Sequence, residues 1–279
     1  PLYQSEGNIS TQFPMTTLEE LGLLKMDFLG LRTLTVIRDA VSMIEKNHEK
    51  KIDIDNIDMN DPEIFKMISD GDTAGVFQLE SSGMTQFFTE LKPSSIEDII
   101  AGISLYRPGP MDQIPRYIRN KKNPEEIRYA HPLLEPILDV TYGCIVYQEQ
   151  VMQIVRDLAG YSLGRSDLVR RAMSKKKKEV MDDERQRFVY GETDSSGKVI
   201  IPGAIRNGLD EKTANEIFDE MSDFASYAFN KSHAAAYAVV SYRTAYLKCH
   251  YPKEYMCALL NSILGDNDKI NEYKAECNE

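Results

Sequence analysis

The sequence has no tryptophan and only four cysteines and four histidines among its 279 residues. No two cysteines show a Cys-x-x-Cys spacing, so the sequence indicates neither a disulfide framework nor a zinc site. There is no run of about 18 consecutive apolar residues, and the first residues lack the basic-then-apolar layout of a secretory signal. We therefore expect a soluble, cytoplasmic protein with reduced thiols. The cysteines are Cys144, Cys249, Cys257 and Cys277.

Positive charge is also scarce overall. The net charge is −11, which by itself argues against nucleic-acid binding, because phosphate contacts require clustered lysines and arginines. The basic residues are unevenly distributed, however. Residues 165–178 contain several lysines and arginines but only one acidic residue, Asp167. An acidic protein with such a basic segment can still bind phosphates. The basic residues of this segment are Arg165, Arg170, Arg171, Lys175, Lys176, Lys177 and Lys178.

Apolar periodicity predicts a mainly α-helical chain. Hydrophobic residues make up 42% of the sequence, enough for one large domain or two modest ones. The first twenty residues are polar and predict irregular structure, whereas Asp61-Pro62-Glu63 is typical of a capped helix start. Loops rich in glycine and proline separate the helices and are predicted at 107–110, 130–136 and 191–203. Three- and four-residue apolar spacing and helix start signals predict helices over 33–47, 210–228, 232–250 and 252–264.

Residues 21–31 have a different pattern, because apolar and polar residues alternate along LGLLKMDFLGL. This alternation predicts an extended strand with Lys25 and Asp27 on the same face. Gly30 ends the pattern. From this pattern alone, a lysine and an aspartate on the surface of an edge strand are the favoured interpretation.

Six strings, in this order and over nearly the whole chain, resemble the bacterial DNA polymerase III alpha-subunit family of C-family replicative polymerases. The resemblance implies a multi-helix fingers domain over 31–279. Before it, residues 1–30 would be the strand-containing C-terminal piece of a palm with a polymerase-beta-type nucleotidyltransferase fold. We therefore expect the chain to be an excised piece of a longer protein. The strings are KMDFLGLRTL (25–34), GVFQLESSGM (75–84), YRPGPM (106–111), YQEQVMQI (147–154), GYSLGRSDLVRRAMSKKK (160–177) and FNKSHAAAYAVVSYRTAYLK (229–248).

The resemblance implies DNA-directed DNA synthesis during bacterial chromosome replication, by nucleotidyl transfer with two Mg²⁺ ions held by carboxylates. Asp27 matches the family's third metal-site aspartate. Lys25, on the same predicted strand face, would contact the triphosphate of the incoming nucleotide or balance the charge of the Asp27 carboxylate. The family's other two catalytic aspartates form a D-x-D motif upstream of this chain, so we expect the isolated chain to be inactive. Asp53 and Asp55 also form a D-x-D, but they lie between predicted helices and are interpreted as a solvated acidic turn.

The basic segment is expected to bind the incoming nucleotide. By resemblance, Arg170 and Arg171 would grip its triphosphate, since arginine offers a planar fork for phosphate. Lys175 and Lys176 are assigned to the same site. For Lys177 and the residue that follows it, a solvated helix end is an equally good interpretation.

Three further segments supply candidate residues. Lys231 and His233 lie at the predicted start of the alanine-rich helix, where free N–H groups favour an anion, here a phosphate of the nucleotide or of the template. A structural role for His233 is an equal alternative. Asn230 and Ser232 are expected to cap that helix. Arg107 is a candidate contact to the template DNA backbone, within the rigid turn of the RPGPM string. Gln148 and Glu149 are expected to make buried polar contacts that orient the basic helix.

The expected partners are primer–template DNA and deoxynucleoside triphosphates, with other replisome subunits binding elsewhere on the polymerase and no membrane contact. A non-enzymatic helical module that binds nucleic acid or a partner protein is the alternative. Lys25 and Asp27 on one strand face, upstream of the paired arginines, favour the polymerase, because a binding module does not need them.

Overall fold

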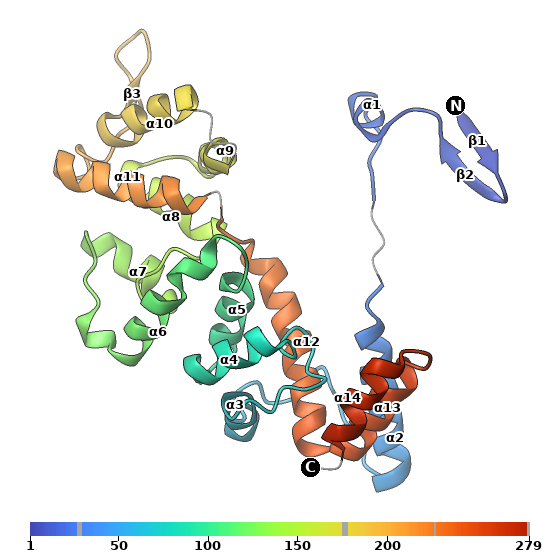
Figure 1. Ribbon diagram of the computed structural model, residues 1–279. Coiled ribbons are helices and arrows are strands. Elements are labelled where there is room, and N and C mark those ends of the chain that lie inside the picture. Colours follow the sequence, from blue (N-terminus) through green and yellow to red (C-terminus); the bar gives the residue numbers. More distant parts are fainter. Residues whose placement is uncertain (27–29, 175–177, 226, 278–279) are drawn as a thin grey trace.

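The computed structural model describes residues 1–26, 30–174, 178–225 and 227–277. These residues form fourteen α-helices and two small antiparallel hairpins, which confirms the predicted mainly-α fold (Figure 1). No helix within the described ranges is long and apolar enough to cross a membrane. Single-turn 3₁₀ helices at 110–113, 124–126, 132–134 and 139–141 punctuate the middle of the chain.

The N-terminal segment stands apart from the helical body (Figure 1). It contains the hairpin of β1 (Leu2–Ser5) and β2 (Asn8–Thr11), followed by α1 (Met15–Glu20), so the expectation of irregular structure here is wrong. The predicted strand is also wrong for residues 21–26. Residues 21–22 form a turn, and residues 23–26 have no regular secondary structure. A strand needs hydrogen-bonded neighbours, and no described strand pairs with these residues.

Three hydrophobic cores organise the helical body. The first is built by helices that pack around the long helix α12 (Lys231–His250). Its other helices are α3 (Pro62–Ser69), α4 (Ser82–Leu91), α5 (Ile96–Leu105) and α6 (Ile114–Lys122).

The second core lies beyond the N-terminal end of α12 (Figure 1). It includes a small hairpin of β3 (Glu192–Thr193) and β4 (Val199–Ile201). This hairpin lies inside a segment that the sequence predicted to be a loop. The helices of this core are α7 (Glu135–Leu138), α8 (Gln148–Ala159), α9 (Leu163–Ser174), α10 (Lys178–Tyr190) and α11 (Glu211–Ala225).

The third core joins the end of α12 to helices from both ends of the chain: α2 (Arg32–His48), α13 (Pro252–Ser262) and α14 (Asn267–Glu276).

Helix α12 also packs closely within the first core, where its buried alanines Ala234, Ala238 and Ala245 let neighbouring helices approach. Helix α12 therefore connects the first and third cores, and the N–H of its first residue, Lys231, donates to Glu149 of α8, a helix of the second core.

Candidate nucleotide-binding junction

The N-termini of α8 and α12 lie side by side because the residues just before them pair as a short parallel bridge between Tyr147 and Phe229. The Phe229 N–H donates to the Val146 carbonyl at 3.0 Å, and the Gln148 N–H donates to the Phe229 carbonyl at 2.9 Å. We call this meeting point of the two segments the α8–α12 junction. It brings together two of the recognised strings that are about eighty residues apart in the sequence.

Arg170 of α9 is connected to this junction through Gln148. Its Nη1 donates to Gln148 Oε1 at 3.1 Å, and the Gln148 Nε2 donates to the Ala228 carbonyl at 3.1 Å. The predicted polar contact between Gln148 and the basic helix is therefore confirmed. On the same helix, Asp167 accepts from Arg170 Nη2 at 2.7 Å and pairs with Arg171 Nε at 2.8 Å.

The two arginines differ in exposure. The Arg170 side chain is only 20% exposed, whereas that of Arg171 is 64% exposed. The hydrogen bond from Arg170, together with the charges of both arginines, lowers the pKa of Asp167 below the usual aspartate range. Arg170 is thus held in a defined orientation, and Arg171 presents its charge to solvent beside it.

Arg107 contacts the residues that lead into α12. Its Nη2 donates to the Tyr227 carbonyl at 2.9 Å, and its guanidinium carbon lies 4.0 Å from the centre of the Phe229 ring, a cation–π contact. The turn that carries it needs a glycine at Gly109, where φ is +103° and a Cβ atom would lie 2.3 Å from the Tyr227 ring. The RPGPM turn therefore packs directly against Tyr227 and Phe229, which lie just before α12.

The N-terminus of α12 already holds a carboxylate. Asn230 accepts from the His233 N–H at 2.9 Å, which confirms it as the cap. Glu149 accepts from the Lys231 N–H at 3.1 Å and from the Asn230 side chain at 3.0 Å. Glu149 therefore contacts α12 rather than the basic helix. The Lys231 amine pairs with Glu97 at 3.0 Å, a partner that no sequence signal indicated.

His233 and Arg107 line the same cavity of about 550 Å³, as does Phe229. The His233 ring stands edge-on to Phe229, with centroids 5.4 Å apart, and lies 4.4 Å from the Tyr237 ring. Aromatic walls with a guanidinium at the edge suit a planar or anionic group. The other lining residues are Phe77, Gln78, Glu80, Ser81, Met84, Ile103 and Tyr106.

Among the described residues, the predicted site residue Lys25 is not part of this arrangement. Lys25 is exposed in the N-terminal segment, which Figure 1 shows well away from α9. Asp27, Lys175, Lys176 and Lys177 lie outside the described residues.

The acidic turn behaves as predicted. Asp53 accepts from the Asn56 side chain at 2.8 Å, and Asp55, whose side chain is 73% exposed, pairs with Arg243 at 2.6 Å. Asp53 therefore stabilises a local turn, and Asp55 forms a surface ion pair. The two aspartates do not form a metal-binding motif on a strand.

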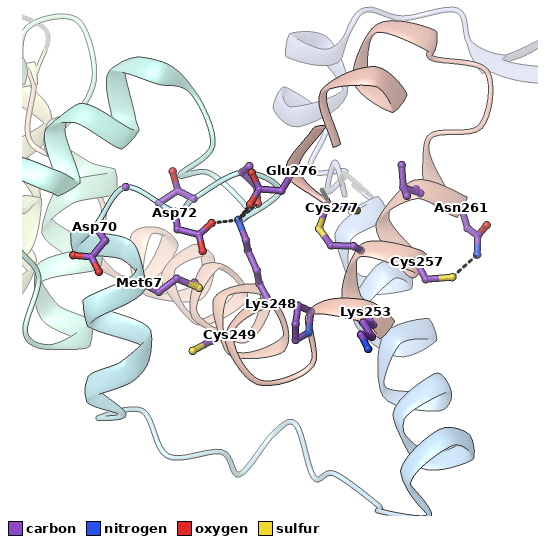
Figure 2. A pocket seen from close by; sticks show the side chains of 16 residues that line it. Met67, Asp70, Asp72, Lys248, Cys249, Lys253, Cys257, Asn261, Glu276 and Cys277 are labelled. Carbon is purple, nitrogen blue, oxygen red and sulfur yellow. Dashed lines mark hydrogen bonds and ion pairs between the residues drawn. The ribbon is translucent and has the colours of Figure 1, made fainter. Parts of the chain in front are cut away.

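A larger cavity, of about 1190 Å³, lies between α3, α12, α13 and the end of α14, and no predicted site residue lines it (Figure 2). Its most buried charge is Lys248, whose side chain is 5% exposed. The Lys248 amine donates to the Ala74 carbonyl at 2.9 Å and pairs with Asp72 and Glu276. This ion cluster joins the loop after α3 to the end of α14.

Comparison with known proteins places the chain in a family. Residues 33–195, more than half of the chain, match the family described as bacterial DNA polymerase III alpha subunit finger domain. The chain is 50% identical over 271 residues to the DNA polymerase III subunit alpha of Bacillus subtilis, an alignment that covers 97% of this chain and 23% of that protein. It is 51% identical over 273 residues to the subunit of Thermus aquaticus, covering 96% and 21%. The subunit of Borreliella burgdorferi is 47% identical over 278 residues, covering 99% and 23%. The chain thus spans less than a quarter of the length of these relatives, and it belongs to the bacterial DNA polymerase III alpha subunit finger domain family.

Proposed function

We propose that this chain is the part of a bacterial replicative DNA polymerase that binds the incoming deoxynucleoside triphosphate. Residues 31–279 would be the fingers and residues 1–30 the end of the palm. The observation that carries the proposal is the convergence of basic side chains from separate segments on the α8–α12 junction. These side chains are Arg107, Arg170, Arg171, Lys231 and His233.

Arg170 and Arg171 would contact the triphosphate, with Lys175, Lys176, Lys231 and His233 adding charge or donors. The contacts of Arg170 with Asp167 and Gln148 support this role, because a guanidinium held in place loses less conformational entropy when it binds. The exposed Arg171 supplies charge that can steer an anion to the site.

Arg107 would contact the DNA backbone near the template. Its guanidinium is already oriented by the Tyr227 carbonyl and the Phe229 ring, so a phosphate could bind it without a large rearrangement. We infer that primer–template DNA passes this side of the junction. The protein would act in the bacterial cytoplasm during chromosome replication, with other replisome subunits binding elsewhere on the polymerase.

Asp27 would hold Mg²⁺ at the catalytic centre, and Lys25 would lie near the same triphosphate. Mg²⁺ prefers carboxylate and phosphate oxygens and retains water ligands, and with a second ion it would stabilise the attacking and leaving oxygens. One aspartate cannot hold two ions. The other carboxylates would therefore come from elsewhere in the polymerase, and chain 1–279 alone would not extend a primer.

The test is Asp27→Asn in the full-length polymerase. The amide keeps the shape of the side chain but loses its charge, so kcat for primer extension should fall about a thousandfold or more while the fold is retained. Asp55→Asn is the matched control, because Asp55 lies in the solvated acidic turn outside the proposed metal site and its replacement should leave kcat unchanged. More than a tenth of wild-type activity in Asp27→Asn would remove Asp27 from the metal site.

A further inference from the structure

A cluster of potential metal ligands lies where the end of α12 meets the start of α3. Cys249 and His250 are the last two residues of α12, and Glu63 is in the first turn of α3. One ligand atom from each residue, a thiol sulfur, an imidazole nitrogen and a carboxylate oxygen, lies within 4.8 Å of the other two. None of these residues belongs to the proposed nucleotide site.

A fourth residue fixes the orientation of the histidine. His250 Nε2 lies 2.8 Å from Asp61 Oδ2, and the other oxygen of Asp61 accepts from the Glu63 N–H at 2.9 Å as the cap of α3. The Asp61 N–H in turn donates to the Tyr242 hydroxyl at 3.0 Å. An ionised carboxylate only accepts hydrogen bonds, so Nε2 is the nitrogen that donates to Asp61 and Nδ1 is the nitrogen left for a metal ion.

His250 Nδ1 is also close to the carboxylate of the cluster, since it lies 3.9 Å from Glu63 Oε2. Ligand atoms on one tetrahedral zinc ion lie about 3.3–3.6 Å apart, given bonds of about 2.0–2.3 Å. Closing this gap takes a rotation of the Glu63 side chain, which is 74% exposed and therefore free to adjust. A metal-bound histidine whose other nitrogen donates to a carboxylate is the usual arrangement in zinc proteins.

We propose that Cys249, His250 and Glu63 bind one Zn²⁺, with water as the fourth ligand and Asp61 as the positioning residue for His250. A thiolate and an imidazole favour Zn²⁺, whereas Mg²⁺ prefers oxygen ligands only. The ion would fasten the start of α3 to the end of α12. The cysteine spacing gave no sign of this site, because Glu63 is distant in sequence and the other two ligands are adjacent.

The first measurement is titration of reduced chain 1–279 with Zn²⁺ by calorimetry, in excess Mg²⁺. We expect one Zn²⁺ bound per chain, a higher melting temperature with Zn²⁺, and a thiolate-to-metal absorption band when Co²⁺ is used instead. No saturable binding in the presence of Mg²⁺ would overturn the proposal. The result does not depend on the polymerase assignment, since it requires neither nucleotide nor DNA.

Variants then identify the ligands. Cys249→Ala should abolish the Co²⁺ band, and Glu63→Gln, an exposed change that leaves packing intact, should weaken Zn²⁺ binding about a hundredfold or more. Asp61→Asn keeps a helix-capping side chain and should weaken binding about 10- to 100-fold. Cys257→Ser, which alters an exposed cysteine outside the cluster, is the control and should bind as the unmodified chain does. Equal affinity in Cys249→Ala and Cys257→Ser would show adventitious binding and contradict the proposal.

Discussion

At the residue scale, a single buried amide holds the start of α8 in place. Gln150 Oε1 accepts from the N–H groups of Val146 and Tyr147 at 2.8 and 2.9 Å. Its Nε2 donates to the Ile137 carbonyl at 3.1 Å and to Thr141 Oγ1 at 2.7 Å. Because Val146 and Tyr147 also form the α8–α12 junction, this amide positions the backbone on which the proposed site is built.

Gln150→Leu should therefore be strongly destabilising. Leucine has nearly the same volume but leaves two buried N–H groups and one carbonyl without a partner, and each costs about 1–3 kcal/mol. We expect the free energy of unfolding, measured with urea, to fall by about 3 kcal/mol or more. The control is Gln86→Leu, an exposed glutamine of α4. A loss no greater than that of the control would mean that these hydrogen bonds do not hold the junction.

At the scale of elements, α9 is organised by one aspartate that pairs with arginines one turn ahead of it. Asp167 pairs with Arg170 at i+3 and with Arg171 at i+4. The hydrogen bond from Arg170, with the charges of both arginines, lowers the pKa of Asp167. Its contribution to stability is thus present above the ordinary aspartate pKa and is lost as the pH falls through the lower pKa of the folded state.

The expected outcome is a pH-dependent difference between the unmodified chain and Asp167→Asn. The difference in unfolding free energy should be largest at neutral pH and should shrink as the pH falls below about 3.9, the ordinary aspartate pKa. Urea unfolding at a series of pH values measures it. Asp157→Asn, which removes the partner of Arg156 on α8, controls for general charge effects. A difference that stayed constant down to acid pH would contradict the assignment of Asp167.

Local signals in the sequence predicted the elements well where the element depends on its own residues. Helix α3 starts as predicted because Asp61 and Pro62 satisfy its first turn locally, and α2 follows its apolar stripe. The strand over 21–26 was wrong, because a strand depends on neighbours that the alternation of side chains does not reveal. The hairpin at 192–201 was missed because glycines at its ends indicated a loop.

The candidate site was predicted only in part for a similar reason. The residue types were visible: the paired arginines Arg170 and Arg171, and the cap Asn230. Their partners were not, because Glu149 and Glu97 reach α12 from more than eighty residues away. A capping carboxylate contributed by another helix leaves no spacing pattern in the sequence, and only the packing of α8 and α5 against α12 reveals it.

At the scale of the whole molecule, the proposed site lies where the first two cores meet. Tyr147 packs in the first core, and Val151, one turn later in α8, packs in the second. Arg107 approaches the junction from the first core and Arg170 from the second, so the spacing between the two guanidinium groups depends on how the cores pack. The central claim is that Arg170 serves nucleotide binding rather than DNA binding.

The most direct test is Arg170→Ala in the full-length polymerase, with Arg156→Ala on the exposed face of α8 as the control. Nucleotide KM should rise and kcat should fall, lowering kcat/KM about tenfold or more, since a hydrogen bond to a charged group is worth about 1.5–3 kcal/mol. Affinity for primer–template DNA should change little at either of two salt concentrations. Unchanged nucleotide KM, with weaker DNA binding and a salt dependence reduced by about one unit of slope, would contradict the account.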